Sequence, residues 1–141
     1  MRIILDTNVL VSGLLSPFGS PGEIVRMVSA GAIRLCVDAR LLTEYEQVLL
    51  RPRFGFDPAA VAALIDYIDV TSDKVASAPL GVRLPDPDDE AFLEVAVASG
   101  AEYLVTGNLA HFPCEVCAGV SVVPPAGFVE AYRSTESSGN A

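Results

Sequence analysis

The stretch that decides the fold is RIILDTNVL, residues 2–10. Its apolar residues Ile3, Ile4 and Leu5 follow one another without alternating polar residues, which is the pattern of a strand covered on both faces of a parallel sheet. Asp6 comes directly after this run. Ligands of open α/β sheets bind outside the carboxyl ends of the strands, so Asp6 is the first candidate for a functional residue. A carboxylate at this place also fits a plain helix cap or turn.

Strands and helices alternate along the rest of the chain. Apolar runs predict further strands at residues 33–37, 103–106 and 120–123. Capping residues and amphipathic periods predict helical segments at residues 8–15, 20–31, 39–51, 59–68, 88–99 and 125–132. Residues 71–78 fit either a strand or a loop. Residues 79–87 contain three prolines and a glycine, and therefore predict the longest loop.

This alternation predicts an α/β fold, a three-layer α/β/α sandwich around a central, mostly parallel sheet. A chain of 141 residues with 51% hydrophobic content is long enough to bury one core and too short for two ordinary domains. We therefore expect one domain at residues 1–133, followed by a flexible C-terminal tail at residues 134–141.

The sequence indicates the cellular compartment in which the protein is expected. The mean hydropathy is +0.44, yet the apolar runs end well before membrane-spanning length, so no membrane helix is expected. The residues before Asp6 lack the apolar core of a secretory signal, and we expect a cytoplasmic protein. Three cysteines, an odd number, argue against a disulfide framework.

The formal net charge of -9 argues against nucleic-acid binding, because Lys and Arg supply most of the affinity for phosphates. The objection weakens if several carboxylates gather around divalent cations, since a bound ion then sets the sign of the local field. Arg51, Arg53 and Arg83 lie in or beside predicted loops. They fit a solvated surface, or contacts to phosphates if the fold brings them to the acidic edge.

Asp89 is the second candidate. It precedes Phe92, Leu93 and Ala96 by three, four and seven residues, which places it on the core-facing stripe of its helix. Glu90 and Glu94 are expected to face solvent instead. A carboxylate on an apolar stripe is costly to desolvate unless something compensates it, and a divalent cation shared with Asp6 would do so. The alternative is simple stabilisation of the helix dipole by an acid in the first turn.

Two glutamates border the apolar face of the helix predicted at residues 39–51. Glu44 lies on the side of Leu41 and Val48, and Glu46 lies on the opposite side. The spacing alone does not choose between them, and either one also fits a solvated helix edge.

Four segments in order resemble the PIN domain, the nuclease fold of many VapC-type toxins. The resemblance covers Ile3 to about Tyr132, and its motifs lie at residues 5–10, 42–49, 86–93 and 104–108. It is strongest to toxin components of toxin–antitoxin pairs in which a Thr-Gly-Asn or Thr-Gly-Asp turn is followed by His-Phe-Pro. Residues 106–108 and 111–113 fit that pattern.

The resemblance implies a metal-dependent endoribonuclease that hydrolyses phosphodiester bonds in single-stranded RNA, acting as the toxin of such a pair. It implies Asp6, Glu44 and Asp89 as catalytic metal ligands, and so prefers Glu44 over Glu46. Oxygen-rich sites suit Mg²⁺ or Mn²⁺, which activate a water and hold the scissile phosphate. Asn8 and Thr106 are expected to orient the ligands.

Asn108 departs from the family pattern. It stands where many members place a fourth acid, and an amide brings no charge to a second metal site. Asp86 or Asp88 is the expected substitute.

His111, Cys114 and Cys117 lie close together in sequence and raise the alternative of a zinc site, with Cys36 as a fourth ligand. The usual ligand spacing is incomplete, so we expect buried thiols and a structural hydrogen bond of the histidine instead.

The high apolar content and the 19% of charged residues indicate that a partner covers part of the surface. We expect a homodimer or higher homo-oligomer, and a cognate antitoxin. One alternative function is a noncatalytic interaction module of the same fold. Another is a Mg²⁺-dependent phosphatase or receiver-like domain, but Thr7 stands where a receiver has a second acid, and the only lysine is Lys74.

Overall fold

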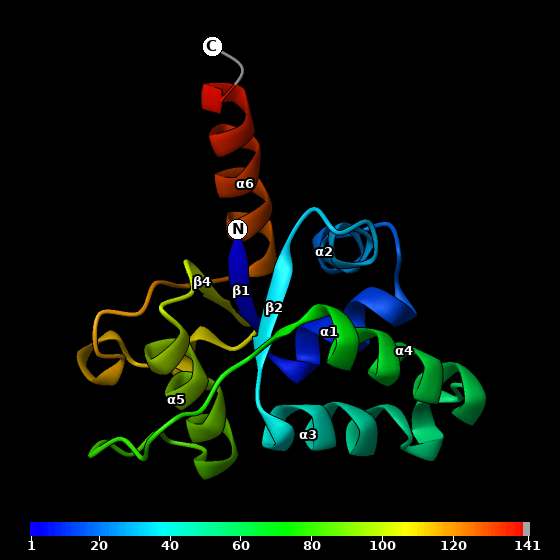
Figure 1. Cartoon of the computed structure of the whole chain (residues 1–141), viewed down its shortest axis with the longest axis horizontal. Coiled ribbons are helices and arrows are strands. Elements are labelled where there is room, and N and C mark those ends of the chain that lie inside the picture. Colours follow the sequence, from blue (N-terminus) through cyan, green and yellow to red (C-terminus); the bar gives the residue numbers. More distant parts are fainter. Residues whose placement is uncertain (140–141) are drawn as a thin grey trace.

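The sheet is built from five parallel strands in the order β3-β2-β1-β4-β5, of which Figure 1 labels β2, β1 and β4. The computed structural model describes residues 1–139, without the side chains of residues 114, 138 and 139. The strands are β1 (Arg2–Leu5), β2 (Arg34–Val37), β3 (Asp73–Lys74), β4 (Tyr103–Val105) and β5 (Val122–Val123). The predicted parallel sheet is confirmed, and the ambiguous segment at residues 71–78 contributes its edge strand β3.

Six α-helices flank this sheet, as expected for the predicted sandwich. They are α1 (Thr7–Leu15), α2 (Ser20–Ser29), α3 (Ala39–Leu49), α4 (Pro58–Thr71), α5 (Glu90–Ser99) and α6 (Pro125–Gly139). Helix α5 packs against β1, β2 and β4, whereas α6 packs against β4 and α2. Helix α3 packs on α4, and Figure 1 shows these two helices and α5 on either side of the lower end of the sheet.

The centre of the core is the apolar run of β1. Ile3, Ile4 and Leu5 have no exposed surface, so β1 is covered on both faces as its apolar run predicted. Complete burial of such a side chain contributes about 1.5–3 kcal/mol to folding. Strand β1 lies between β2 and β4, and its carboxyl end therefore opens between two neighbouring strand ends.

The helix caps place two carboxylates differently from the sequence prediction. The helix predicted from Asp88 begins as a 3-10 turn, η2 (Pro87–Asp89), and α5 starts only at Glu90. Asp86, rather than Asp88, is the capping residue, and it accepts a hydrogen bond from the Asp88 backbone N–H at 3.0 Å. The reason is Pro87, which has no N–H and fits the first position of a helical turn, so the cap moves one residue ahead of it.

The last helix is longer than predicted. It continues to Gly139 instead of ending near Tyr132, so the expected tail is helical from residue 134 to residue 139, and its last two residues lie outside the described residues. Side-chain contacts one turn apart explain the extension, because the Tyr132 hydroxyl donates to Glu136 at 3.0 Å. Arg133 also pairs with Glu23 of α2 at 2.8 Å. Regular structure therefore extends past the boundary expected at residue 133.

Across residues 1–139, none of the helices is both long enough and apolar enough to cross a membrane.

Candidate metal centre

Asp6 stands at the junction of β1 and β4. Its backbone N–H donates to the Val105 carbonyl at 2.9 Å, which continues the pairing of the two strands by one residue. Its side chain is 5% exposed, and its Oδ2 accepts a hydrogen bond from the Thr106 hydroxyl at 2.7 Å. Thr106, the first residue after β4, thus holds the side chain of Asp6, the first residue after β1.

Glu44 reaches the same junction from α3. The buried hydroxyl of Thr7, the residue after Asp6, donates a hydrogen bond to Glu44 Oε2. Glu44 is half-buried, whereas Glu46 is exposed. The Tyr45 hydroxyl donates to the Leu5 carbonyl at 2.6 Å and fixes α3 against the end of β1. The structure therefore brings Glu44 to Asp6 and leaves Glu46 at the surface, a difference that spacing did not decide.

Asp89 lies at the end of η2, with a side chain that is nearly buried. Its Oδ2 is 3.0 Å from His111 Nδ1, an atom carried by the 3-10 turn η3 (Leu109–His111) that follows β4. Asp86 completes this group, since single ligand atoms of Asp86, Asp89 and His111 all lie within 4.8 Å of one another. Asp6 and Glu44 lie outside this tight group. The charge of Asp6 acts on Asp89, and the charge of Asp6 also acts on Glu44.

The carboxyl groups raise one another's pKa. Burial, followed by repulsion from Asp6 and Asp86, raises the pKa of Asp89 to about 6, against the opposing effect of His111. Burial also raises the pKa of Asp6, although Thr106 donates a hydrogen bond to it. Several acids that lie close together and are largely buried are costly to keep in their charged form. The centre is therefore a place where a cation would be favourable.

The pKa of Glu44 is raised for the same reasons, first by burial and then by the charge of Asp6. Its hydrogen bond from Thr7 and the charge of Arg51 act in the opposite direction. The charge of Asp6 thus acts on Glu44, although Glu44 lies on α3 and Asp6 follows β1.

The donor atoms of the centre fit a hard divalent cation. Carboxylate oxygens suit Mg²⁺ and Mn²⁺, and an imidazole nitrogen favours a first-row transition metal over Mg²⁺. Of the three predicted ligands, Asp89 lies within a group of such donor atoms, together with Asp86 and His111. The acidic group at Asp86, Asp89 and His111 is the part of this arrangement whose ligand atoms stand within reach of one ion.

The two predicted amide residues have different positions. Asn8 Oδ1 accepts a hydrogen bond from the Gly107 backbone N–H at 3.3 Å, so it orients the turn after β4 rather than a carboxylate. The Asn108 backbone N–H donates to the Thr106 hydroxyl at 3.0 Å, and the residue itself is exposed. Both residues therefore form hydrogen bonds within the turn that contains Thr106.

Sequence reasoning gave His111 no place in the centre. It predicted a structural hydrogen bond for this residue, and that bond exists, but its acceptor is the candidate ligand Asp89. The sequence signal that could have indicated this role is the order Thr-Gly-Asn and then His-Phe-Pro. Only one 3-10 turn, η3, leads from the end of the first motif to His111. Cys36 and Cys117 are not members of this group of ligand atoms among the described side chains, and the side chain of Cys114 lies outside the described residues. The Cys117 thiol donates to the Pro113 carbonyl at 3.2 Å.

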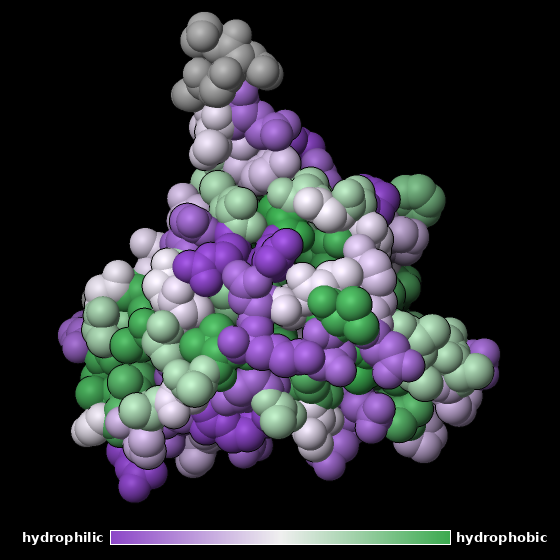
Figure 2. All heavy atoms as spheres, in the orientation of Figure 1, coloured by the Kyte–Doolittle hydropathy of each residue, from purple (hydrophilic) through white to green (hydrophobic). Residues whose placement is uncertain are grey.

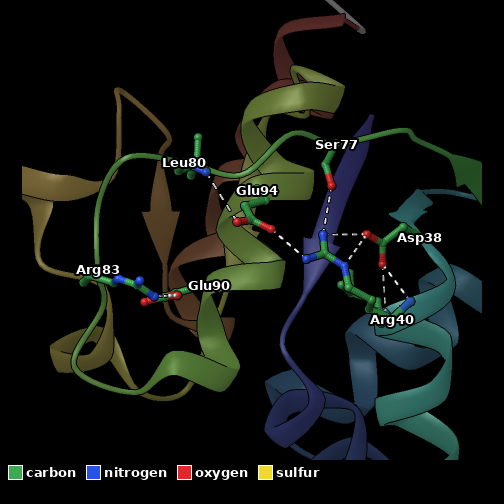
Figure 3. A network of polar contacts seen from close by, with 8 residues as sticks. Asp38, Arg40, Ser77, Leu80, Arg83, Glu90 and Glu94 are labelled. Carbon is green, nitrogen blue, oxygen red and sulfur yellow. Dashed lines mark hydrogen bonds and ion pairs between the residues drawn. The ribbon is translucent and has the colours of Figure 1, made fainter.

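A polar network fastens the flank of the centre, where α3 meets α5 (Figure 3). The Arg40 guanidinium contacts Asp38 and Glu94, each at 2.7 Å, and the Ser77 hydroxyl at 2.8 Å. Glu90 accepts a hydrogen bond from the Leu84 backbone N–H at 3.0 Å. The expectation that Glu90 and Glu94 face solvent is therefore wrong. The loop after β3 supplies the partners of Glu90 and one partner of Glu94, whose other partner is Arg40 of α3.

Comparisons with known proteins agree with this fold. Residues 2–110 match a family model described as a PIN domain. The fold resembles a chain in the crystal structure of VapBC2 from Rickettsia felis bound to a DNA fragment from their promoter, with a TM-score of 0.58 and 15% sequence identity. That alignment covers 88% of this chain and 98% of the other. No curated protein matches the sequence.

Proposed function

The chain belongs to the PIN-domain family, and on that premise we propose that it is a metal-dependent endoribonuclease that hydrolyses phosphodiester bonds in single-stranded RNA. Asp6, Glu44 and Asp89 are the proposed catalytic ligands of a Mg²⁺ or Mn²⁺ ion. One observation supports the proposal: Asp6 after β1, Glu44 on α3 and Asp89 on η2 each lie in the field of another acid, although they come from separate elements.

The protein's own residues prepare this centre before any substrate arrives. Thr106 holds Asp6, Thr7 holds Glu44, and His111 holds Asp89, each through a hydrogen bond. Orientation by such partners keeps the ligand oxygens in place. A bound ion would neutralise the acids, polarise the scissile phosphate and favour attack by water. We propose Asp86 rather than Asp88 as the substitute for the missing fourth acid, because Asp86 stands beside Asp89 and Asp88 is exposed.

We also propose that the chain is the toxin of a toxin–antitoxin pair in the cytoplasm. The likeness in fold to a VapBC2 chain supports an antitoxin partner. Exposed apolar side chains support a covered surface, because Phe18 is 97% and Val70 is 82% exposed. On the face shown in Figure 2, hydrophobic residues lie scattered among hydrophilic ones. The proposed occupants are the antitoxin and a second copy of the chain, in a homodimer or higher oligomer.

A noncatalytic module of the same fold is the second candidate function, and the uncharged Asn108 favours it. One experiment separates the two. Purified protein is incubated with a pool of mixed single-stranded RNA in Mg²⁺, in Mn²⁺ and in EDTA, beside the Asp6→Asn variant. We expect cleavage by the natural protein in either metal only, and none by the variant, with unchanged circular dichroism. Turnover by Asp6→Asn equal to that of the natural protein would refute the assignment of the centre.

Phosphatase chemistry is tested in the same samples with p-nitrophenyl phosphate. Hydrolysis of that ester without cleavage of RNA would favour a phosphatase, and activity on neither substrate would favour the noncatalytic module.

A further inference from the structure

Helix α3 carries a polar stripe that leads away from the candidate metal centre. Glu44, Gln47 and Arg51 are spaced at i, i+3 and i+7, so they follow one side of the helix into the turn after it. They line a surface hollow of about 500 Å³ together with Thr43 and Asp88. A smaller hollow of about 290 Å³ continues from it on the other side of Glu44, because Arg40, Glu44 and Asp88 line both. The two hollows therefore adjoin each other at Glu44.

Arg51 differs from the other basic residues of this acidic chain, which has nine Lys and Arg against 18 Asp and Glu. Six of the nine form ion pairs, namely Arg2, Arg34, Arg40, Lys74, Arg83 and Arg133. Arg26 donates to the Pro17 carbonyl, and the Arg53 guanidinium lies 4.8 Å from the centre of the Phe54 ring. Within the described part of the chain, the exposed guanidinium of Arg51 has no hydrogen bond, ion pair or ring contact.

We propose that this hollow binds the backbone of the RNA substrate beside the scissile bond, with Arg51 contacting a phosphate there. The inference rests on the proposed ribonuclease function and adds the path of the substrate. A guanidinium fits a phosphate through two parallel hydrogen bonds. A chain of net charge -9 repels RNA elsewhere, so an uncommitted cation beside the centre has a large share in holding the strand.

The position of Arg51 defines which phosphate it contacts. Arg51 lies two residues beyond the end of α3, in the turn that leads into η1 (Pro52–Phe54). The residues that line its hollow do not include Asp86, Asp89 or His111, whose ligand atoms stand within reach of one ion. Arg51 therefore binds a phosphate of a neighbouring nucleotide, and it acts in substrate binding rather than in the chemical step.

The test compares Arg51→Gln with Arg51→Lys, and with Arg53→Gln as the matched control two residues away. Cleavage of a mixed-sequence 12-nucleotide RNA is measured at several salt concentrations. We expect Arg51→Gln to raise KM roughly tenfold at low salt while kcat changes less than about twofold, because a contact made equally before and during the reaction affects binding alone. Arg51→Lys recovers part of the loss, since it keeps the charge and loses the paired hydrogen bonds. Arg53→Gln behaves as the natural protein.

Binding is measured separately by fluorescence anisotropy of the labelled RNA, with Asp6→Asn as the background that prevents cleavage. Removal of one phosphate contact on a single strand lowers the slope of log Kd against log salt by about 0.7. An unchanged slope and KM in Arg51→Gln, while the natural protein still cleaves RNA, would overturn the inference and leave the proposed function standing. A fall in kcat at constant KM would also overturn it, because Arg51 would then act through Glu44. If the natural protein neither binds nor cleaves the RNA, both proposals fail together.

Discussion

The Nδ1 atom of His111 lies 3.0 Å from Oδ2 of Asp89, so the only histidine of the chain is hydrogen-bonded to a nearly buried carboxylate of the candidate metal centre. The two residues come from different 3-10 turns, η2 and η3. Their contact therefore ties the start of α5 to the turn after β4.

This contact predicts an effect of His111→Gln on metal binding. Loss of a partner that orients a ligand lowers metal affinity about 10- to 100-fold, and we expect a loss in this range for Mn²⁺, measured by titration calorimetry without RNA. The loss for Mg²⁺ should be smaller, because imidazole contributes less to Mg²⁺ binding. Glu115→Gln, an exposed change nearby, is the control. Equal Mn²⁺ affinity in all three proteins would place His111 outside the centre.

The pKa of Asp89 predicts how stability depends on pH in the absence of metal. Its pKa is raised to about 6 in the folded protein, so the fold binds this proton more tightly than the unfolded chain does. The contribution of protonated Asp89 to the free energy of unfolding is therefore complete below the unfolded pKa near 4. It is lost as pH rises through about 6. Its full size is on the order of 3 kcal/mol or less.

Because of Asp89, we expect metal-free protein in EDTA to melt at a higher temperature at pH 5 than at pH 7. Asp6 and Glu44 act in the same direction. The Asp89→Asn variant should show a weaker dependence on pH, and Mn²⁺ should raise the melting temperature of the natural protein at pH 7. An identical pH dependence in the variant would show that Asp89 does not carry this effect.

The two glutamates of α3 offer a matched pair of substitutions. Glu44 accepts a hydrogen bond from Thr7 beside Asp6, whereas Glu46 is exposed. We expect Glu44→Gln to lower the rate of metal-dependent RNA cleavage by at least the 10- to 100-fold that loss of an outer ligand partner costs. Glu46→Gln should stay within about twofold, since it touches no group in the centre. The reverse ranking would contradict the choice of Glu44.

Particular residues show how far the sequence alone predicts this molecule. Ile3 to Leu5 reveal the central strand because every residue is apolar, and Asp89 is found by its helical spacing from Leu93 and Ala96. Spacing cannot separate Glu44 from Glu46, because both border one apolar face and only the tertiary contact to Thr7 distinguishes them.

His111, Glu90 and Glu94 show what the sequence leaves open. Their contacts depend on segments whose course no periodic pattern records. The turn after β4 carries His111 to Asp89, and the segment after β3 supplies partners to Glu90 and Glu94. A helix period assigns faces, but it does not show which faces a loop will cover.

Asn108 provides the last prediction, because it is an uncharged residue linked to Asp6 through Thr106. Its backbone N–H bonds the Thr106 hydroxyl that in turn holds Asp6. Asn108→Asp replaces the amide by an acid of nearly the same shape at an exposed position. One added charge in a solvated place contributes roughly 1 kcal/mol, so we expect Mg²⁺ affinity to rise about fivefold by calorimetry.

The matched control is Asn108→Ala, which removes the amide without adding a charge and should leave Mg²⁺ affinity near that of the natural protein. In EDTA, Asn108→Asp should melt at a slightly lower temperature, because a further acid then adds to the repulsion around Asp6. Equal Mg²⁺ affinity in the Asp and Ala variants would mean that residue 108 is too far from the ion for its charge to matter. The centre would then depend on Asp86 alone for a fourth acid.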